Sequence, residues 1–299
     1  MRVRRVGMAL SSCALLIAVS LIAVSGCKSS NEKVEFDWLT VEPIDLDRPV
    51  PETLPELLDY SRLPELEVHY PDSRETVEPD EFPYTCIGQL LVYYPDGTVG
   101  QSTAFLVAPA HILTVADVFV GPDGEREYSH AVFTPGLTGA TMPFGSAKVV
   151  EAAVPEKYIK EVNLRPCNVA VAVLDKRIGV TAGYFAFESI DPHVNTGVPV
   201  TTAGYARDTG ASTMVQARGR FERYGYPGLW WNDLDADIGQ NGSPVWIQRG
   251  DQPVVIAMLT RGEGRHSQAI GPAYDHEEML DAIREWIADN PCKTAGDPE

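Results

Sequence analysis

The stretch DIGQNGSPVW, residues 237–246, sets two glycines three positions apart and places a proline before an apolar run. The pattern Gly-x-x-Gly-x-Pro ahead of such a run predicts a glycine-shaped loop that leads into a β-strand. Asn241 stands between the two glycines. An uncharged amide therefore occupies the middle of this loop.

The segments around the loop are short apolar runs separated by turn residues. CIGQLLVYYPDGTVGQSTAFLVA (86–108) reads as a strand, a Pro-Asp-Gly turn and a second strand. Comparable runs are HILTVA (111–116), NVAVAVLD (168–175), VPVTTAGYA (198–206), SPVWIQRGDQPVVIAML (243–259) and QAIGPAY (268–274). Only DHEEMLDAIREWIADN (275–290) places its apolar residues on one helical face. Many short strands and one closing helix predict an all-β fold built of barrels.

Several segments together resemble the trypsin-like serine proteases, most closely their V8-like (glutamyl endopeptidase) branch. The similarity runs in unbroken order from about residue 71 to residue 290. Its segments are PDSRETV (71–77), PYTCIGQLLVYYPDG (83–97), STAFLVAPAHILTVADV (102–118), PEKYIKEVNLRPCNVAVAVLD (155–175), TTAGYARD (201–208) and LDADIGQNGSPVW (234–246). The resemblance implies two six-stranded antiparallel β-barrels followed by the C-terminal helix.

The resemblance also implies a degenerate catalytic triad. The position of the nucleophilic hydroxyl is Asn241, that of the base is Asp117, and that of the orienting carboxylate is Asn168. An amide has no hydroxyl to attack a carbonyl, and an aspartate is a poor base for an alcohol at neutral pH. Gly239 and Asn241 hold the positions whose backbone N–H groups form the family's oxyanion hole. No intact catalytic residue is therefore expected.

The three substitutions are compatible with a satisfied polar cluster. With Asn168 in place of a carboxylate, Asp117 is expected to face the two amides of Asn168 and Asn241, each able to donate hydrogen bonds. Neutral drift after loss of activity is the alternative explanation.

Other polar residues near these motifs have ordinary structural explanations. The histidine of the family follows the LTVA strand, whereas His111 lies in the turn before that strand. Ser243 lies two residues past the nucleophile position. Asp235 is expected to serve loop structure, and Leu259 replaces the histidine with which the V8-like branch recognises acidic side chains. The remaining histidines are expected mostly on the surface; they include His130, His193 and His266.

The N-terminus has the three parts of an export signal. MRVRR (1–5) is basic, an apolar run follows, and VSGC (24–27) ends it with small residues before Cys27. This ending resembles the bacterial lipobox, so we predict a signal peptide over residues 1–26 and a lipid on Cys27. The chain would then sit on a bacterial cell membrane, facing away from the cytoplasm. An uncleaved transmembrane anchor is the competing interpretation.

The next stretch is acidic and rich in proline. Residues 28–84 hold 16 Asp or Glu, five Lys or Arg and eight prolines. Such a composition favours an extended, solvated chain, so we predict a tether over residues 27–80, with a propeptide or docking segment as the alternative. The protease-like domain is then expected over residues 81–291, with a tail over residues 292–299.

Net charge limits the possible partners, and the cysteine count limits the possible disulfides. The net charge of −18 argues against a nucleic-acid partner, because phosphate would be repelled. No motif indicates a cofactor or a metal ion. Cys86, Cys167 and Cys292 allow at most one internal disulfide, and the sequence does not choose the pair.

Together these features predict a membrane-anchored, inactive homologue of a trypsin-like serine protease. It would bind a protein or peptide partner, or act in scaffolding or regulation at the cell surface. Two alternatives remain at this level. One is an active serine-type endopeptidase or hydrolase that uses Ser243 or Asp117 as its nucleophile, and the other is a structural envelope lipoprotein.

Overall fold

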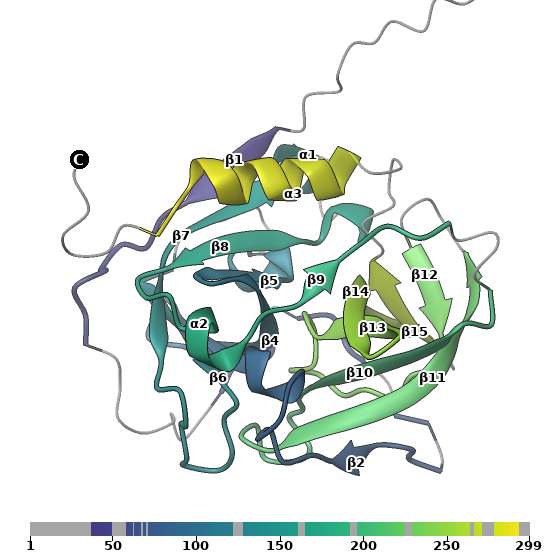
Figure 1. Ribbon diagram of the computed structural model, residues 1–299. Coiled ribbons are helices and arrows are strands. Elements are labelled where there is room, and N and C mark those ends of the chain that lie inside the picture. Colours follow the sequence, from purple (N-terminus) through teal and green to yellow (C-terminus); the bar gives the residue numbers. More distant parts are fainter. Residues whose placement is uncertain are drawn as a thin grey trace, which may run out of the picture. The chain divides into compact units, whose positions relative to one another are not determined.

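Short antiparallel strands form two sheets in the computed structural model (Figure 1). The structure describes residues 37–49, 58–61, 63–66, 68–69, 71–121, 128–160, 165–191, 196–224, 229–263, 266–270 and 278–292. The strands are β1 (Trp38–Val41), β2 (Glu75–Thr76), β3 (Ile87–Tyr93), β4 (Val99–Ala108), β5 (His111–Thr114), β6 (His130–Pro135), β7 (Ala147–Pro155), β8 (Ala170–Leu174), β9 (Ala186–Phe187), β10 (Pro199–Tyr205), β11 (Met214–Tyr224), β12 (Leu229–Asn232), β13 (Pro244–Arg249), β14 (Gln252–Glu263) and β15 (His266–Ile270). The helices are α1 (Glu156–Lys160), α2 (Gly179–Ala182) and α3 (Glu278–Asp289), with 3-10 turns η1 (Tyr84–Cys86), η2 (Ala116–Val118) and η3 (Arg165–Cys167).

The first sheet is a closed barrel. Its strands follow the order β7-β6-β3-β4-β5-β8, and an additional pairing of β7 with β8 closes it. The hairpin of β3 and β4 sets the register, with Ile87 opposite Phe105 and Tyr93 opposite Val99. Gly97 takes the left-handed backbone conformation at its turn, with φ 88°, which favours glycine. The predicted strand-turn-strand is confirmed.

The second sheet also returns on itself. Its path runs β10-β13-β14-β15-β12-β11, and β10 pairs with β11 to complete six strands. Two short strands extend it, since β2 pairs with β11 and β9 pairs in parallel with β14. The prediction of an all-β fold with two six-stranded antiparallel barrels is confirmed.

The C-terminal helix α3 closes the chain as the sequence predicts. Met279, Leu280, Ile283 and Trp286 are buried, while the polar residues between them face outward. The apolar stripe thus packs onto the barrel core, which is what a helix with this period requires. None of the described helices is both long and apolar enough to cross a membrane.

Parts of the acidic N-terminal stretch pack on the folded chain, which the sequence did not predict. Strand β1 pairs with β7, with Trp38 opposite Pro155 and Val41 opposite Ala152. Further along, Leu63 and Leu66 are buried at 7% and 4% exposure. In the tether predicted over residues 27–80, β1 and the leucines at 63 and 66 thus pack on the folded chain, because their apolar side chains gain from burial, while most of the other described residues of the stretch are at least partly exposed. Cys27 and the predicted signal peptide lie outside the described residues.

Candidate functional site

Asp117 lies in the η2 turn after β5, and its side chain is 8% exposed. Asn168, just before β8, contacts it in two ways. The Asn168 Nδ2 atom donates to Asp117 Oδ2 at 2.5 Å, and the Asp117 backbone N–H donates to Asn168 Oδ1 at 3.1 Å. The Tyr158 hydroxyl, from α1, donates to the other carboxylate oxygen. Both oxygens of the buried carboxylate are therefore already hydrogen-bonded.

The titration of this carboxyl reflects its burial. Desolvation raises the pKa of Asp117 to about 6, although hydrogen bonds from Tyr158 and Asn168 and the charge of Arg261 act in the opposite direction. Burial and the neighbouring carboxylate also raise the pKa of the Tyr158 hydroxyl, so it stays protonated and acts as a donor. Asp117 is thus held as a partner in a local network.

Tyr158 is the member of this network that the sequence did not reveal. It stands ten residues before Asn168, on a five-residue helix that follows β7. Tyrosine in a short PEKYIK segment has no spacing that marks it as a site residue. Only the fold brings α1 next to the η2 turn.

Asn241 is fully buried, and its side chain faces the surrounding backbone. Its Nδ2 atom donates to the Thr260 carbonyl at 2.6 Å and to the Pro64 carbonyl at 2.9 Å, while its Oδ1 atom accepts the Gly239 N–H at 3.1 Å. Both amide protons are therefore used, and neither goes to Asp117. The prediction that the amides of Asn168 and Asn241 both donate to Asp117 is right for Asn168 and wrong for Asn241.

The loop around Asn241 depends on its glycines. Gly239 and Gly242 have φ values of 98° and 87°, in the left-handed region. A Cβ on Gly242 would also lie 2.1 Å from the Thr103 carbonyl oxygen, so no side chain fits there. Because the Gly239 N–H already donates to the Asn241 side chain, it is not available to a substrate carbonyl.

Ser243 and His111 are both buried and pack against neighbouring parts of the fold. The Ser243 Oγ atom is fully buried, and a Cβ on Gly204 of β10 would lie 2.1 Å from it, which shows how closely the β10 backbone packs against the hydroxyl. The His111 Nε2 atom lies 2.7 Å from the Asn290 carbonyl oxygen, and the ring packs edge-on against Trp286. Burial lowers the pKa of His111. None of the hydrogen bonds of His111 reaches the loop of Asn241.

His130 is buried, although the sequence predicts that the remaining histidines lie mostly on the surface. Its side chain is 1% exposed and stacks on the Tyr93 ring with 4.1 Å between the ring centroids. Burial, chiefly, lowers its pKa to about 4, so the ring is neutral at pH 7. It is a core residue, not a surface one. The side chains of His193 and His266 lie outside the described residues.

Asp235 holds the N-terminal segment in place. Its carboxylate accepts the backbone N–H groups of His69 at 2.7 Å and Ser73 at 2.8 Å, and the Ser73 hydroxyl at 2.5 Å. The His69 Nδ1 atom is 2.9 Å from the same carboxylate. The structural role predicted for Asp235 is confirmed, with the added finding that the structure it supports is the docked N-terminal stretch.

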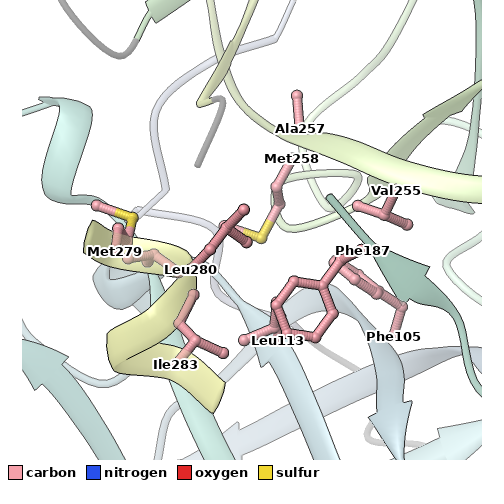
Figure 2. A pocket seen from close by; sticks show the side chains of 10 residues that line it. Phe105, Leu113, Phe187, Val255, Ala257, Met258, Met279, Leu280 and Ile283 are labelled. Atoms are coloured by element: carbon pink, nitrogen blue, oxygen red, sulfur yellow. The ribbon is translucent and has the colours of Figure 1, made fainter. Parts of the chain in front are cut away.

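A separate small cavity lies between the two sheets and helix α3 (Figure 2). Its volume is about 30 Å³, and apolar side chains alone line it. Its lining residues are Phe105, Leu113, Val169, Phe187, Val255, Ala257, Met258, Met279, Leu280 and Ile283. A cavity without polar groups offers no acid, base or nucleophile, so it is a packing feature of the core.

Cys86 is a buried thiol whose Sγ atom donates to the Pro83 carbonyl at 3.0 Å. Burial raises its pKa, so it is not a reactive thiolate. Within the described ranges, no three His, Cys, Asp or Glu side chains gather to hold a metal ion.

Comparison with known proteins agrees with this architecture. No protein-family model matches the chain. Over 210 residues it is 25% identical to the glutamyl endopeptidase of Bacillus licheniformis, an alignment that covers 69% of this chain. The match spans 64% of that relative's length, so it does not by itself carry over the activity.

Solved structures show the same fold. A Glu endopeptidase in complex with MPD superposes with a TM-score of 0.63 at 23% identity, covering 73% of this chain and 99% of that one. The protease Anisep from Arthrobacter nicotinovorans gives a TM-score of 0.60 at 13% identity, with 73% and 100% covered. The scabies mite inactivated protease paralogue S-I1 gives 0.57 at 14% identity, with 73% and 100% covered. The chain has the chymotrypsin-type fold, and the resemblance to the V8-like branch of the serine proteases is confirmed.

Proposed function

We propose that this chain is a catalytically inactive homologue of the V8-like serine proteases that works by binding, scaffolding or regulation at the outer face of a bacterial membrane. The observation that carries the proposal is the state of Asn241. It stands at the position implied for the nucleophile, and it is fully buried. Its side chain forms hydrogen bonds with the backbone of Gly239, Thr260 and Pro64.

The chemistry of acyl transfer needs a hydroxyl and a base that is free to take its proton. Asn241 offers no hydroxyl. The Asp117 carboxylate accepts its hydrogen bonds from Tyr158 and Asn168, and among the described residues no hydrogen bond links it to Asn241 or Ser243. The Gly239 N–H, implied for the oxyanion hole, is also taken. The site thus has no hydroxyl at residue 241, an acid that is held by other side chains, and a Gly239 N–H that donates within the protein.

The burial of Ser243 weighs against an active hydrolase built on that serine. A nucleophile must reach its substrate, and the Ser243 hydroxyl has no exposed surface. Asp117, at 8% exposure with both oxygens bonded, is no better placed. The edge beside Asn241 holds a segment of the chain through the backbone of Pro64 and Glu65, and this use of the edge favours binding over a purely structural role.

The anchor in this proposal is a lipid on Cys27, supported by the small residues before that cysteine. A lipoprotein carries at least two acyl chains, which makes its membrane attachment durable. The acidic stretch then connects the anchor to the folded chain outside the cytoplasm.

The test is hydrolysis of a peptide library by the purified chain, together with labelling by a fluorophosphonate probe. We expect no cleavage and no label. Ser243→Ala and Asn241→Ala serve as matched variants, because any background that persists in both does not depend on the Ser243 hydroxyl or on the Asn241 amide. Turnover by the unmodified chain that either substitution abolishes would overturn the proposal.

A further inference from the structure

Residues 63–66, with the sequence Leu-Pro-Glu-Leu, lie against a free part of the β14 edge. Strand β13 pairs with β14 as far as Pro244 opposite Met258, and the loop before β13 continues the pairing at Leu259, whose N–H donates to the Ser243 carbonyl and whose carbonyl accepts the Gly242 N–H. Past that point the Gly262 N–H donates to the Glu65 carbonyl at 2.6 Å. An extended peptide that adds to an exposed sheet edge through its backbone is a common mode of peptide recognition.

Asn241 takes part in the same contact from the other side. One Nδ2 proton goes to the Thr260 carbonyl of β14 and the other to the Pro64 carbonyl. The side chain therefore bridges the sheet edge and the peptide. A serine at this position could not donate two hydrogen bonds, so the amide suits a site that holds a peptide.

Two leucines anchor the segment. Leu63 packs into the larger apolar cluster, and Leu66 packs into the second one, with Trp230 and Leu259 among its members. By contrast the Glu65 carboxylate is 72% exposed and 3.8 Å from Arg207, an ion pair of little energetic weight. Recognition thus rests on the two leucines and on the backbone of the residues between them.

The same tetrapeptide occurs a second time in the chain. Leu-Pro-Glu-Leu stands at residues 54–57 as well as at residues 63–66, nine positions later. The first copy lies outside the described residues. It carries the same two leucines and the same proline that the site accepts in the second copy.

We propose that the β14 edge beside Asn241 is a recognition site for extended Leu-Pro-Glu-Leu peptides, occupied here by residues 63–66 as a built-in ligand, and that the copy at residues 54–57 competes for it. The inference rests on the proposed function in one respect, since a bound peptide must survive uncut. A tethered ligand has a local concentration in the millimolar range, so an outside peptide binds weakly until the resident segment is displaced.

The experiment measures binding of a labelled peptide, DYSRLPELEVH (59–69), to the full chain by fluorescence anisotropy. The variants replace leucines by aspartate in the resident copy (Leu63→Asp with Leu66→Asp), in the other copy (Leu54→Asp with Leu57→Asp), or in both. The second pair is the matched control, because it makes the same chemical change outside the site. A peptide with both leucines replaced by aspartate is the control ligand.

We expect at least about tenfold tighter binding by the resident-copy variant than by wild type, and tighter binding still by the fourfold variant. The control pair should bind as wild type does, and the control peptide should not bind. Equal affinities throughout, or binding of the control peptide, would overturn the site. Equal affinity of the resident-copy and fourfold variants would overturn the competition by residues 54–57.

Because Leu63 and Leu66 are buried, the resident-copy variant is first checked by thermal unfolding. If it does not fold, a peptide with a photoreactive group in place of its second leucine is added in millimolar excess to wild type. Crosslinks confined to members of the second apolar cluster support the site, and crosslinks scattered over other parts of the chain contradict it. The mass of the recovered peptide separates the two proposals, since a cut peptide would sink the inactive assignment while leaving the site intact.

Discussion

Asn168 and Asp117 bind each other in both directions, with the amide donating to the carboxylate at 2.5 Å and the Asp117 backbone N–H donating back to the amide oxygen at 3.1 Å. A carboxylate in place of Asn168 could accept but not donate. Asn168 therefore acts as donor and acceptor at once, which an ionised aspartate at that position could not do.

We expect Asn168→Asp to destabilise the fold by about 1–3 kcal/mol at pH 7, because it sets two buried carboxylates against each other. The loss should shrink as the pH falls far enough to protonate one of them. Urea unfolding at pH 7 and pH 4 measures both effects. Asn168→Ala is the control, since it removes the hydrogen bonds without adding a charge. A loss in Asn168→Asp that does not depend on pH would contradict the interpretation.

The raised pKa of Asp117 predicts how stability changes with pH. The pKa of about 6 in the folded chain exceeds the unfolded value, so the folded state binds the proton more tightly between about pH 4 and pH 6. The stability contributed by this group is therefore full below pH 4 and is lost as the pH rises through 6. Relative to Asp117→Asn, wild type should lose about 3 kcal/mol between pH 4 and pH 7. A constant difference across that range would show that Asp117 does not titrate as described.

The strands could be predicted because their apolar runs and turns follow from local chemistry. The hairpin at Gly97 and the apolar face of α3 are examples, since each depends on residues close in sequence. The assignment of Asp117, Asn168 and Asn241 to one site came from the order of motifs. What the sequence could not supply was the direction of the Asn241 amide, because both rotamer and partners depend on Thr260 and on a segment 177 residues away.

The N-terminal stretch shows the limit of composition. Its prolines and acids are typical of solvated chain, yet Leu63 and Leu66 are buried in the folded protein. Two leucines three residues apart are too few for a core of their own. They become buried only because barrel surfaces formed by distant strands receive them.

Tyr158→Phe tests the hydrogen bond that the sequence did not reveal. Its hydroxyl donates to Asp117, and a donor to a carboxylate stabilises the ionised form. We expect a loss of about 1–3 kcal/mol at pH 7, a smaller loss at pH 4, and an upward shift of the Asp117 pKa. Urea unfolding with ¹³C NMR titration of the carboxyl measures both. A loss that is the same at the two pH values would assign the effect to packing alone.

Cys27→Ser tests the anchor. The serine cannot carry the thioether lipid, so the protein should either leave the membrane fraction or remain unprocessed. Detergent partitioning and the intact mass distinguish these results from the lipid-modified wild type. A wild-type mature mass without lipid would contradict the assignment of Cys27, whatever the behaviour of the variant.

Asn241→Ser restores a hydroxyl at the position implied for the nucleophile, and we expect it to restore no activity. Asp117 is a poor base for an alcohol at neutral pH, and the hydrogen bonds to its carboxylate come from Tyr158 and Asn168 and not from residue 241. Catalytic groups act as a unit, so partial repair gives little above background. The substitution should instead cost about 1–3 kcal/mol, since a serine hydroxyl can donate to at most one of the Thr260 and Pro64 carbonyls. Peptide hydrolysis and urea unfolding are measured beside Asn241→Ala, which removes the same donor without adding a hydroxyl. A stability loss without turnover in both variants supports the inactive assignment and shows that the amide stabilises the contacts with Thr260 and Pro64. Turnover in the serine variant alone would show that a working base survives at this site.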